Sequence, residues 1–312
     1  MNLITLILEY LDNHRYTIKH RTYLFYLQLT GMYLTKGLFL SPLEQITQTE
    51  LNEFILEKYQ NKKLSNSTLK LIKGLINRSL LYGYKRNYIN QKIEIEVVLK
   101  SNVPNKVEDL TNEEIKKLEL YIVSRKKVYS YGVLISFYTG VRIGELLSLK
   151  WQDIDFKTKI ITINSTTCKI AHNHKVQKII DTPKTSSSLR QIPLSKNVLE
   201  LLKGLKEFQK GQSEFVVSRQ NGKQIDMRSY QDSFYRLLRK LKIKHYGFHS
   251  LRHTFATRCY KLGMDIKTLS EILGHSSPSI TLNRYVHTNI QTKRNALESV
   301  NRKIRNYVYS VI

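Results

Sequence analysis

The spacing of apolar residues changes along this chain, and that change is the strongest constraint on its fold. Over the first hundred residues apolar side chains recur with a helical period, which predicts four helices near residues 2–12, 17–36, 48–60 and 65–84. Between residues 158 and 194 the period becomes two, in the runs KIITIN, VQKIID and LRQIPL. We therefore expect a mainly α fold with a small antiparallel β-sheet, built from these three runs.

A polar segment divides the chain into two parts. The stretch SNVPNKVEDL carries a proline and few apolar residues, and the TNEE that follows has Thr111 and Glu114 at the spacing of a capping box, which marks a helix start. The length of 312 residues also favours two domains over one. We expect a helical domain at 1–97, a linker at 98–110 and a second domain at 111–312.

Charge indicates the class of partner. The chain has 51 Lys and Arg against 25 Asp and Glu, a formal net charge of +26, and a pI near 9.9. Such an excess favours a polyanion, and nucleic acid above all, as the partner. The alternative is a solvated basic surface with no ligand.

The termini and cysteines give no sign of a membrane or of a disulfide framework. MNLITLILEYLDNH is apolar, but Glu9 and Asp12 interrupt it and it is too short to span a bilayer, so we expect a core helix and no membrane partner. Cys168 and Cys259 are far apart, which favours a reducing cytoplasm.

Two basic residues of the second part occur where the chain turns. The segment YSYGVLISFYTG predicts a helix that ends at Gly140, so Arg142 lies between two helices and Glu145, one turn later, can hold its guanidinium. Lys184 lies in TPKTSSS, between the last two predicted strands, near the tip of a polar hairpin. Taken alone, either side chain can be an ordinary solvated surface residue.

The stretch GFHSLRHTFAT places three polar side chains on one helical face. His249, Arg252 and His253 occupy positions i, i+3 and i+4, so their heads can converge on a metal, on a phosphate or on no ligand at all. The same helix has an apolar stripe that we expect to be buried: Leu251, Phe255, Cys259 and Leu262.

Two further helices follow in the sequence. Asp265 can cap DIKTLSEIL, which should stop at Gly274 and place His275 just beyond its end. Pro278 suits the first position of the next helix, which carries Tyr285 about two turns along. Alone, Tyr285 would be an unremarkable half-buried tyrosine.

The residue types favour an anion over a metal as the ligand. The spacing of His249 and His253 resembles a metalloprotease pair, but Ser250 stands where such sites need glutamate, and Arg252 would repel a cation. Arginines, histidines, a lysine and a tyrosine without clustered carboxylates instead form a site for an anion that is stabilised without metal, best interpreted as a phosphodiester. We expect no metal and no cofactor.

At this point the sequence resembles the tyrosine recombinases, also called phage-type integrases. The resemblance rests on TGVRIGELLSLKWQDID, PKTSSSLRQIPL, HSLRHTFAT and LGHSSPSITLNRYVH, in that order. It implies an N-terminal helical core-binding (SAM-like) domain and an α+β catalytic domain that clamp DNA. The chain begins almost at once with the core-binding helices, so an additional N-terminal arm-binding domain is not expected.

The resemblance assigns roles to the candidate residues. Tyr285 would be the nucleophile that forms a 3′-phosphotyrosine without metal or ATP, Lys184 the general acid, and His249 an aid to proton transfer. Glu145 and His253 would orient Arg142 and brace the helix. The complete catalytic set implied is Arg142, Lys184, His249, Arg252, His275 and Tyr285.

The function implied is site-specific recombination, with an integrase and excisionase of a mobile element as the leading hypothesis. The partners would be double-stranded DNA, three further protomers in a tetrameric synapse, and a directionality factor or host DNA-bending protein, in a cytoplasmic, nucleoid-associated setting. An Xer-type resolvase, a type IB topoisomerase-like enzyme and a non-catalytic DNA-binding protein are the alternatives. The C-terminal helix has an apolar stripe suited to a neighbouring protomer: Leu297, Val300, Ile304 and Val308.

Overall fold

The fold is taken from a computed structural model of the 312-residue chain. It describes every residue except 62–63, 101–107, 126, 173–174, 182–188, 286–293, 295–296, 299, 303 and 305–312. At 168–172, 175–181 and 283–285 it describes the backbone and not the side chains. Lys184 and Val308 therefore lie outside the described residues, as does the side chain of Tyr285.

The chain forms two compact units. Met1–Lys106 with Lys169–Ile179 make up the first, and Val107–Cys168 with Ile180–Ile312 make up the second. The predicted linker at 98–110 thus overlaps the change from one unit to the other. Among the helices that the structure describes, none is long and apolar enough to cross a membrane.

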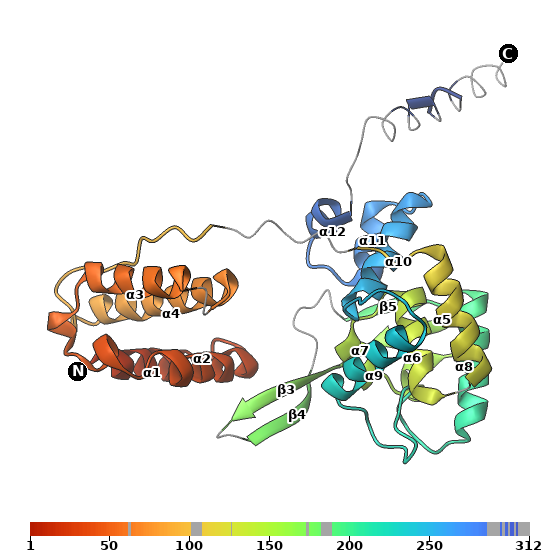
Figure 1. The fold of residues 1–312 in the computed structure, drawn as a ribbon, viewed down its shortest axis with the longest axis horizontal. Helices are drawn as coiled ribbons and strands as arrows, with labels where there is room; N and C mark the ends of the chain where they lie inside the picture. Colours follow the sequence, from red (N-terminus) through yellow and green to blue (C-terminus); the bar gives the residue numbers. More distant parts are fainter. Residues whose placement is uncertain are drawn as a thin grey trace. The chain divides into compact units, whose positions relative to one another are not determined.

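Four α-helices build the first unit around one apolar core (Figure 1). All four were predicted, and α2 is shorter than the predicted 17–36 because a turn at residues 15–18 precedes it. The helical elements are α1 (Leu3–His14), α2 (His20–Tyr33), the 3₁₀ turns η1 (Gly37–Leu40) and η2 (Leu43–Gln45), α3 (Gln48–Gln60) and α4 (Asn66–Lys85).

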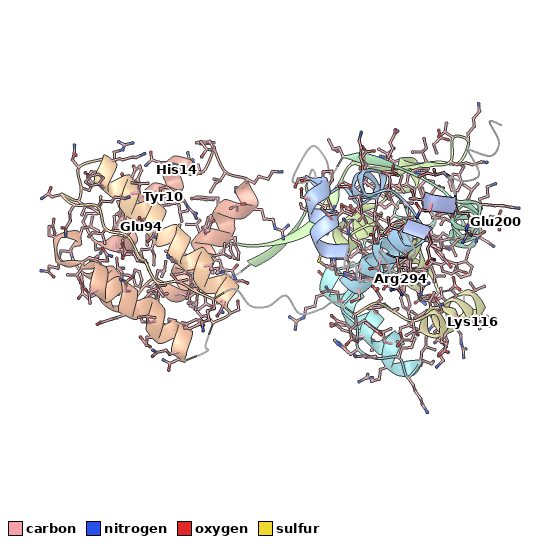
Figure 2. All side chains as sticks on the ribbon, turned by 90° about the horizontal axis from the view of Figure 1, so that it is seen from above. Tyr10, His14, Glu94, Lys116, Glu200 and Arg294 are labelled. Carbon is pink, nitrogen blue, oxygen red and sulfur yellow. The ribbon has the colours of Figure 1, made fainter. Side chains whose placement is uncertain are left out.

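Side-chain caps fix where these helices begin. Asn2 accepts a hydrogen bond from the Thr5 N–H at the start of α1, and Thr47 and Glu50 form a capping box at the start of α3. Further along α1, the rings of Tyr10 and His14 lie 4.3 Å apart, one helical turn from each other (Figure 2).

An extended segment after α4 completes the first core. The Asn77 side chain, on α4, both donates to the carbonyl and accepts from the N–H of Ile95, at 3.2 and 3.0 Å. Ile93 and Ile95 are buried in the helical core. This segment therefore belongs to the helical unit although it has no regular secondary structure.

The second unit combines helices with a small sheet, which confirms the predicted fold class. Its helices are α5 (Asn112–Arg125), α6 (Val128–Thr139), α7 (Ile143–Ser148), η3 (Trp151–Asp153), α8 (Lys196–Gln209), α9 (Met227–Lys240), α10 (His249–Lys261), α11 (Ile266–Leu273) and α12 (Pro278–Tyr285). The strands of the chain are β1 (Ile154–Asp155), β2 (Ile160–Ile163), β3 (Thr166–His172), β4 (Lys175–Asp181) and β5 (Arg190–Pro193).

The pairing of the strands differs from the prediction. The three-stranded antiparallel sheet has the order β1-β2-β5, whereas β4 pairs with β3 in a separate hairpin. The expectation that TPKTSSS joins two paired strands is therefore wrong, because β4 and β5 are not neighbours. Two residues separate β3 from β4, and so short a connection favours pairing within that hairpin.

Helix α10 packs against α6 and α11 and carries the predicted buried stripe, with one exception. Leu251 is fully buried and Phe255 and Cys259 are partly buried, but Leu262 is 88% exposed. The stripe ends there because α10 stops at Lys261, so Leu262 leaves the helical face. The placement of Leu262 in the core was wrong.

Candidate functional site

The C-terminal end of α11 organises the candidate site. Gly274 adopts a left-handed conformation, with φ +65°, immediately after the helix. Its N–H donates to the carbonyl of Glu271 and the N–H of His275 donates to that of Ser270, at 3.0 and 3.1 Å. This is a Schellman motif, and it leaves the next carbonyls along the chain to other donors.

Three arginines supply those donors, each from a different element. Three consecutive carbonyls each accept one guanidinium N–H: Ile272 from Arg190 Nε at 2.6 Å, Leu273 from Arg252 Nη2 at 2.7 Å, and Gly274 from Arg142 Nη2 at 2.9 Å. The carbonyl end of a helix carries partial negative charge, which favours cations there. The end of α11 therefore gathers three positive charges.

Arg252 is the most deeply buried of the three. The residue is 2% exposed, and its Nη1 also donates to the carbonyl of Gly140 at 2.8 Å. Gly140 ends α6 in a left-handed conformation, and a Cβ there would lie 2.6 Å from the Phe255 ring. The predicted helix end at Gly140 is thus observed. The hydrogen bond from Arg252 to the Gly140 carbonyl attaches the end of α6 to α10.

Arg142 is the more accessible arginine. It is the N-cap residue of α7, its side chain is 35% exposed, and Nη1 donates to Glu145 Oε1 at 2.8 Å. The same carboxylate also binds the backbone of this turn, since Glu145 Oε2 accepts a hydrogen bond from the backbone N–H of Arg142 at 2.8 Å. The ion pair between Arg142 and Glu145 was predicted from the sequence, and the structure contains it.

Arg190 was missed in the sequence analysis. It opens β5 opposite Ile163, its side chain is 5% exposed, and its Nη1 and Nη2 donate to the two oxygens of Glu145 at 3.1 and 2.9 Å. A signal was available in LRQIPL, because Arg190 lies two residues before the buried Ile192 and so on the same face of the strand. A charge on a buried face needs a partner.

The charges of the two arginines determine the ionisation of Glu145. Burial alone would raise the pKa of this carboxyl, but the hydrogen bonds and charge of Arg190, with the charge of Arg142, outweigh burial and lower the pKa to about 2. Glu145 is therefore ionised throughout the physiological range. It neutralises one of the three guanidinium charges, which leaves two.

His275 is attached to the helix that carries the candidate nucleophile. Its Nδ1 lies 2.7 Å from the hydroxyl of Thr281, a fully buried residue of α12. The last residue of α12 is Tyr285, so the tyrosine backbone lies one turn beyond Thr281. The structure brings Arg142, Arg252 and His275 to one helix end; the side chains of Lys184 and Tyr285 are outside the described set.

The other two candidate histidines, His249 and His253, lie on α10 in different surroundings. His249 is the first residue of the helix and is exposed. His253 is buried, and its Nδ1 lies 2.8 Å from Asp109 Oδ1. Burial alone would raise the pKa of Asp109, but the hydrogen bond and charge of His253 outweigh burial and lower it.

The arrangement is suited to an oxyanion and poorly suited to a metal. Fixed guanidinium donors at a negative helix end can stabilise a phosphate by charge-assisted hydrogen bonds. Both oxygens of Glu145 already accept hydrogen bonds from arginines, so this carboxylate is poorly placed to bind a metal ion as well. Over the described part of the chain, no group of three His, Cys, Asp or Glu side chains could hold a metal ion.

We predict that Glu145→Gln lowers the free energy of unfolding by about 3–5 kcal/mol at neutral pH, because it leaves the buried Arg190 side chain and the partly exposed Arg142 side chain without a charged partner. The loss should shrink as the pH falls below the ordinary glutamate pKa and toward about 2, the pKa in the fold. A carboxyl whose pKa is depressed in the fold contributes its full stabilisation above the pKa that it has in the unfolded chain, and loses that contribution progressively as the pH falls to the pKa that it has in the fold. Denaturant unfolding between pH 7 and pH 3 measures this.

Glu200→Gln is the matched control, since Glu200 lies on the exposed face of α8 (Figure 2). It should change the free energy of unfolding by less than about 0.5 kcal/mol. An equal loss in both variants, or a Glu145→Gln loss that does not depend on pH, would contradict the assignment of Glu145.

Comparisons with known proteins identify the family to which the chain belongs. The sequence profile of the phage integrase family matches residues 108–292. A tyrosine recombinase XerC-like protein of Caldanaerobacter subterraneus subsp. tengcongensis is 29% identical over 82% of this chain and 71% of its own length. The transposase from transposon Tn916 of Enterococcus faecalis is 30% identical over 62% of this chain, which spans about half of that protein (51%).

A solved structure gives the same two-domain fold. The Tn1549 transposon integrase, determined in complex with a circular intermediate DNA, superposes with a TM-score of 0.81 at 25% identity and covers 96% of this chain and 99% of that one. Because the family profile matches more than half of the sequence, and the predicted motifs lie within the match, the chain belongs to the phage integrase family, the tyrosine recombinases.

Proposed function

We propose that this protein is a site-specific tyrosine recombinase that cuts and rejoins double-stranded DNA, as the integrase and excisionase of a mobile element. The observation that carries the proposal is the end of α11, where Arg142, Arg252 and His275 gather beside the helix that ends at Tyr285. Membership of the recombinase family and similarity to transposon proteins support it.

The reaction exchanges one phosphodiester for another. The Tyr285 hydroxyl oxygen attacks the scissile phosphorus, the new bond joins tyrosine to the 3′ phosphate, and the bond from phosphorus to the 5′ oxygen breaks. His249 accepts the phenolic proton and Lys184 gives a proton to the departing 5′ oxygen. The reverse steps, with the 5′ hydroxyl of a partner strand, rejoin DNA and release the tyrosine.

The guanidiniums stabilise charge that builds on the phosphate. Arg142 is the more exposed cation and can present its guanidinium edge to a non-bridging oxygen. Arg252 is buried and its two Nη atoms donate to the carbonyls of Gly140 and Leu273, so it supplies a positive charge held in one orientation beside the phosphate. Nδ1 of His275 lies against the Thr281 hydroxyl, so in this proposal Nε2 is the ring nitrogen that carries a proton and donates it in a hydrogen bond to the phosphate.

Neither metal nor ATP is needed in this scheme. The two guanidinium charges not neutralised by Glu145 replace a Lewis acid, and the phosphotyrosine ester conserves the energy of the broken bond. No directionality factor or host protein takes part in the chemical step. Such proteins would act on the assembly, together with the tetramer on two DNA sites.

A chromosome or plasmid dimer resolvase is the second candidate, and the XerC-like relative favours it. The two functions share the chemistry and differ in the DNA that is recombined. Sequencing recombined junctions separates them, because excision and integration join element ends to a target, whereas resolution joins two copies of one site.

We predict that Tyr285→Phe binds DNA but forms no covalent complex, because only the nucleophilic oxygen is removed. The measurement traps protein on a nicked suicide substrate in EDTA and without nucleotide, followed by denaturing gel electrophoresis. Unmutated protein should be trapped under these conditions.

Tyr260→Phe is a matched control, because Tyr260 lies on α10 and packs in the small apolar cluster of α10 and α11. It should trap at the unmutated rate. Trapping by Tyr285→Phe would identify a different nucleophile, and loss of trapping in EDTA would restore a metal-dependent mechanism.

We also predict that Lys184→Ala slows cleavage by about 10²–10⁴-fold, the usual contribution of a general acid, without weakening DNA binding. Replacing the bridging 5′ oxygen by sulfur creates a leaving group that needs little protonation, so this substrate should restore the rate. Arg142→Ala should gain much less, because its charge acts on the non-bridging oxygens. Equal rescue of both variants, or none for Lys184→Ala, would place the general acid elsewhere.

The C-terminal segment supports assembly in this proposal. Leu297, Val300 and Ile304 share one helical face and are 64%, 51% and 55% exposed, so the single chain leaves this stripe open to a neighbouring protomer. Removing residues 296–312 should spare binding of one protomer to a half-site and weaken formation of the pair and the synapse. Gel shifts with half-site and full-site DNA measure both steps; unfolding of the truncated protein would show that the stripe packs within its own chain.

A further inference from the structure

The carboxylate of Glu145 is fully occupied by hydrogen bonds from two sides. One oxygen accepts from Arg142 Nη1 and Arg190 Nη1, at 2.8 and 3.1 Å, and the other accepts from Arg190 Nη2 and the Arg142 backbone, at 2.9 and 2.8 Å. Four donors fill the acceptor capacity of a carboxylate. Arg142 is therefore held to a carboxylate whose own position is fixed by Arg190.

Arg190 also fixes the second attachment point of Arg142. Its Nε donates to the Ile272 carbonyl at 2.6 Å, two residues before the Gly274 carbonyl that accepts from Arg142 at 2.9 Å. One side chain of β5 thus contacts both partners of the Arg142 guanidinium, the carboxylate and the end of α11. Moving Arg190 would release both partners together.

Burial separates the roles of the two arginines. Arg190 is 5% exposed and directs all three guanidinium nitrogens to protein acceptors, whereas Arg142 is 35% exposed. A phosphate can therefore contact Arg142 but not displace the contacts of Arg190 without breaking the buried ion pair. Arg190 can therefore influence a bound phosphate by fixing the position of Arg142.

We propose that Arg190 is a positioning residue for DNA cleavage, which holds Glu145 and the carbonyl end of α11 so that Arg142 is aligned on the scissile phosphate. The proposal rests on the proposed function, since it requires that Arg142 contact that phosphate. Lysine cannot replace Arg190, because an ammonium keeps the charge but lacks the planar fork that reaches the carboxylate and the carbonyl together.

The experiment measures covalent trapping rates on two suicide substrates for Arg190→Lys and Arg190→Met. One substrate has the natural phosphate and the other has a methyl group in place of one non-bridging oxygen, which removes the negative charge. We expect Arg190→Lys to cleave the natural substrate about 10–100-fold more slowly, as for other misplaced contacts, with DNA affinity unchanged. Its rate on the neutral substrate should be close to that of unmutated protein, because that reaction depends less on Arg142.

A double-variant cycle tests the route through Arg142. In an Arg142→Ala background the further change Arg190→Lys should cost less than about twofold, since the residue through which it acts is already absent. Arg236→Lys is the matched control, because Arg236 is an exposed arginine of α9 whose Nη2 donates to Ser233 at 2.8 Å. It should leave both rates unchanged.

The outcomes separate the inference from the function on which it rests. Equal slowing on both substrates by a folded Arg190→Lys protein, additive losses in the cycle, or an unmutated rate for Arg190→Lys would each overturn the positioning role. Thermal melting identifies the folded variants, and Arg190→Lys decides the test if Arg190→Met fails to fold. Failure of the unmutated protein to be trapped by either substrate would instead overturn the proposed function.

Discussion

The carbonyl end of α11 is the constraint on which the candidate site depends. Five consecutive carbonyls, those of residues 270–274, are all satisfied there: the Schellman motif uses the first two and three guanidiniums use the rest. Since an unsatisfied buried carbonyl is costly, the helix end and the arginines require each other. Arg142, Arg190 and Arg252 come from three elements distant in sequence, so this one end also joins α7, β5 and α10.

Electrostatic balance explains why three cations can lie so close together. Glu145 stays ionised because its pKa is lowered to about 2, and the negative end of α11 adds partial charge of the same sign. The remaining positive charge is held in place before any ligand arrives. Such preorganisation lets a site stabilise a developing oxyanion without reorganising at the moment of reaction.

Local sequence patterns predicted the helices of the first unit and those that carry the site, although α8 and α9 were not predicted. They also predicted the helix ends at Gly140 and Gly274, because glycine readily adopts the left-handed conformation that follows a helix. Strand pairing was not predicted, because alternation reveals a strand and not its neighbour; β4 pairs with β3, and β5 with β2. Arg190 was missed for a related reason. Its importance comes from contacts with Glu145 and Ile272, 45 and 82 residues away.

The start of the second unit shows that polar residues in a sequence do not always form an exposed linker. Residues 98–110 were predicted as a linker because they are polar, yet Asp109 contacts His253 and the Leu110 N–H donates to the buried hydroxyl of Thr254 at 3.0 Å. The polar groups of Asp109 and Leu110 hydrogen-bond to α10, so these two residues are part of the second unit. Arg252 and His253 are consecutive on α10 and therefore point about 100° apart, one to the helix ends and the other to this stretch. The helix that carries His249 is therefore held from both directions, which fixes the candidate site within the second unit.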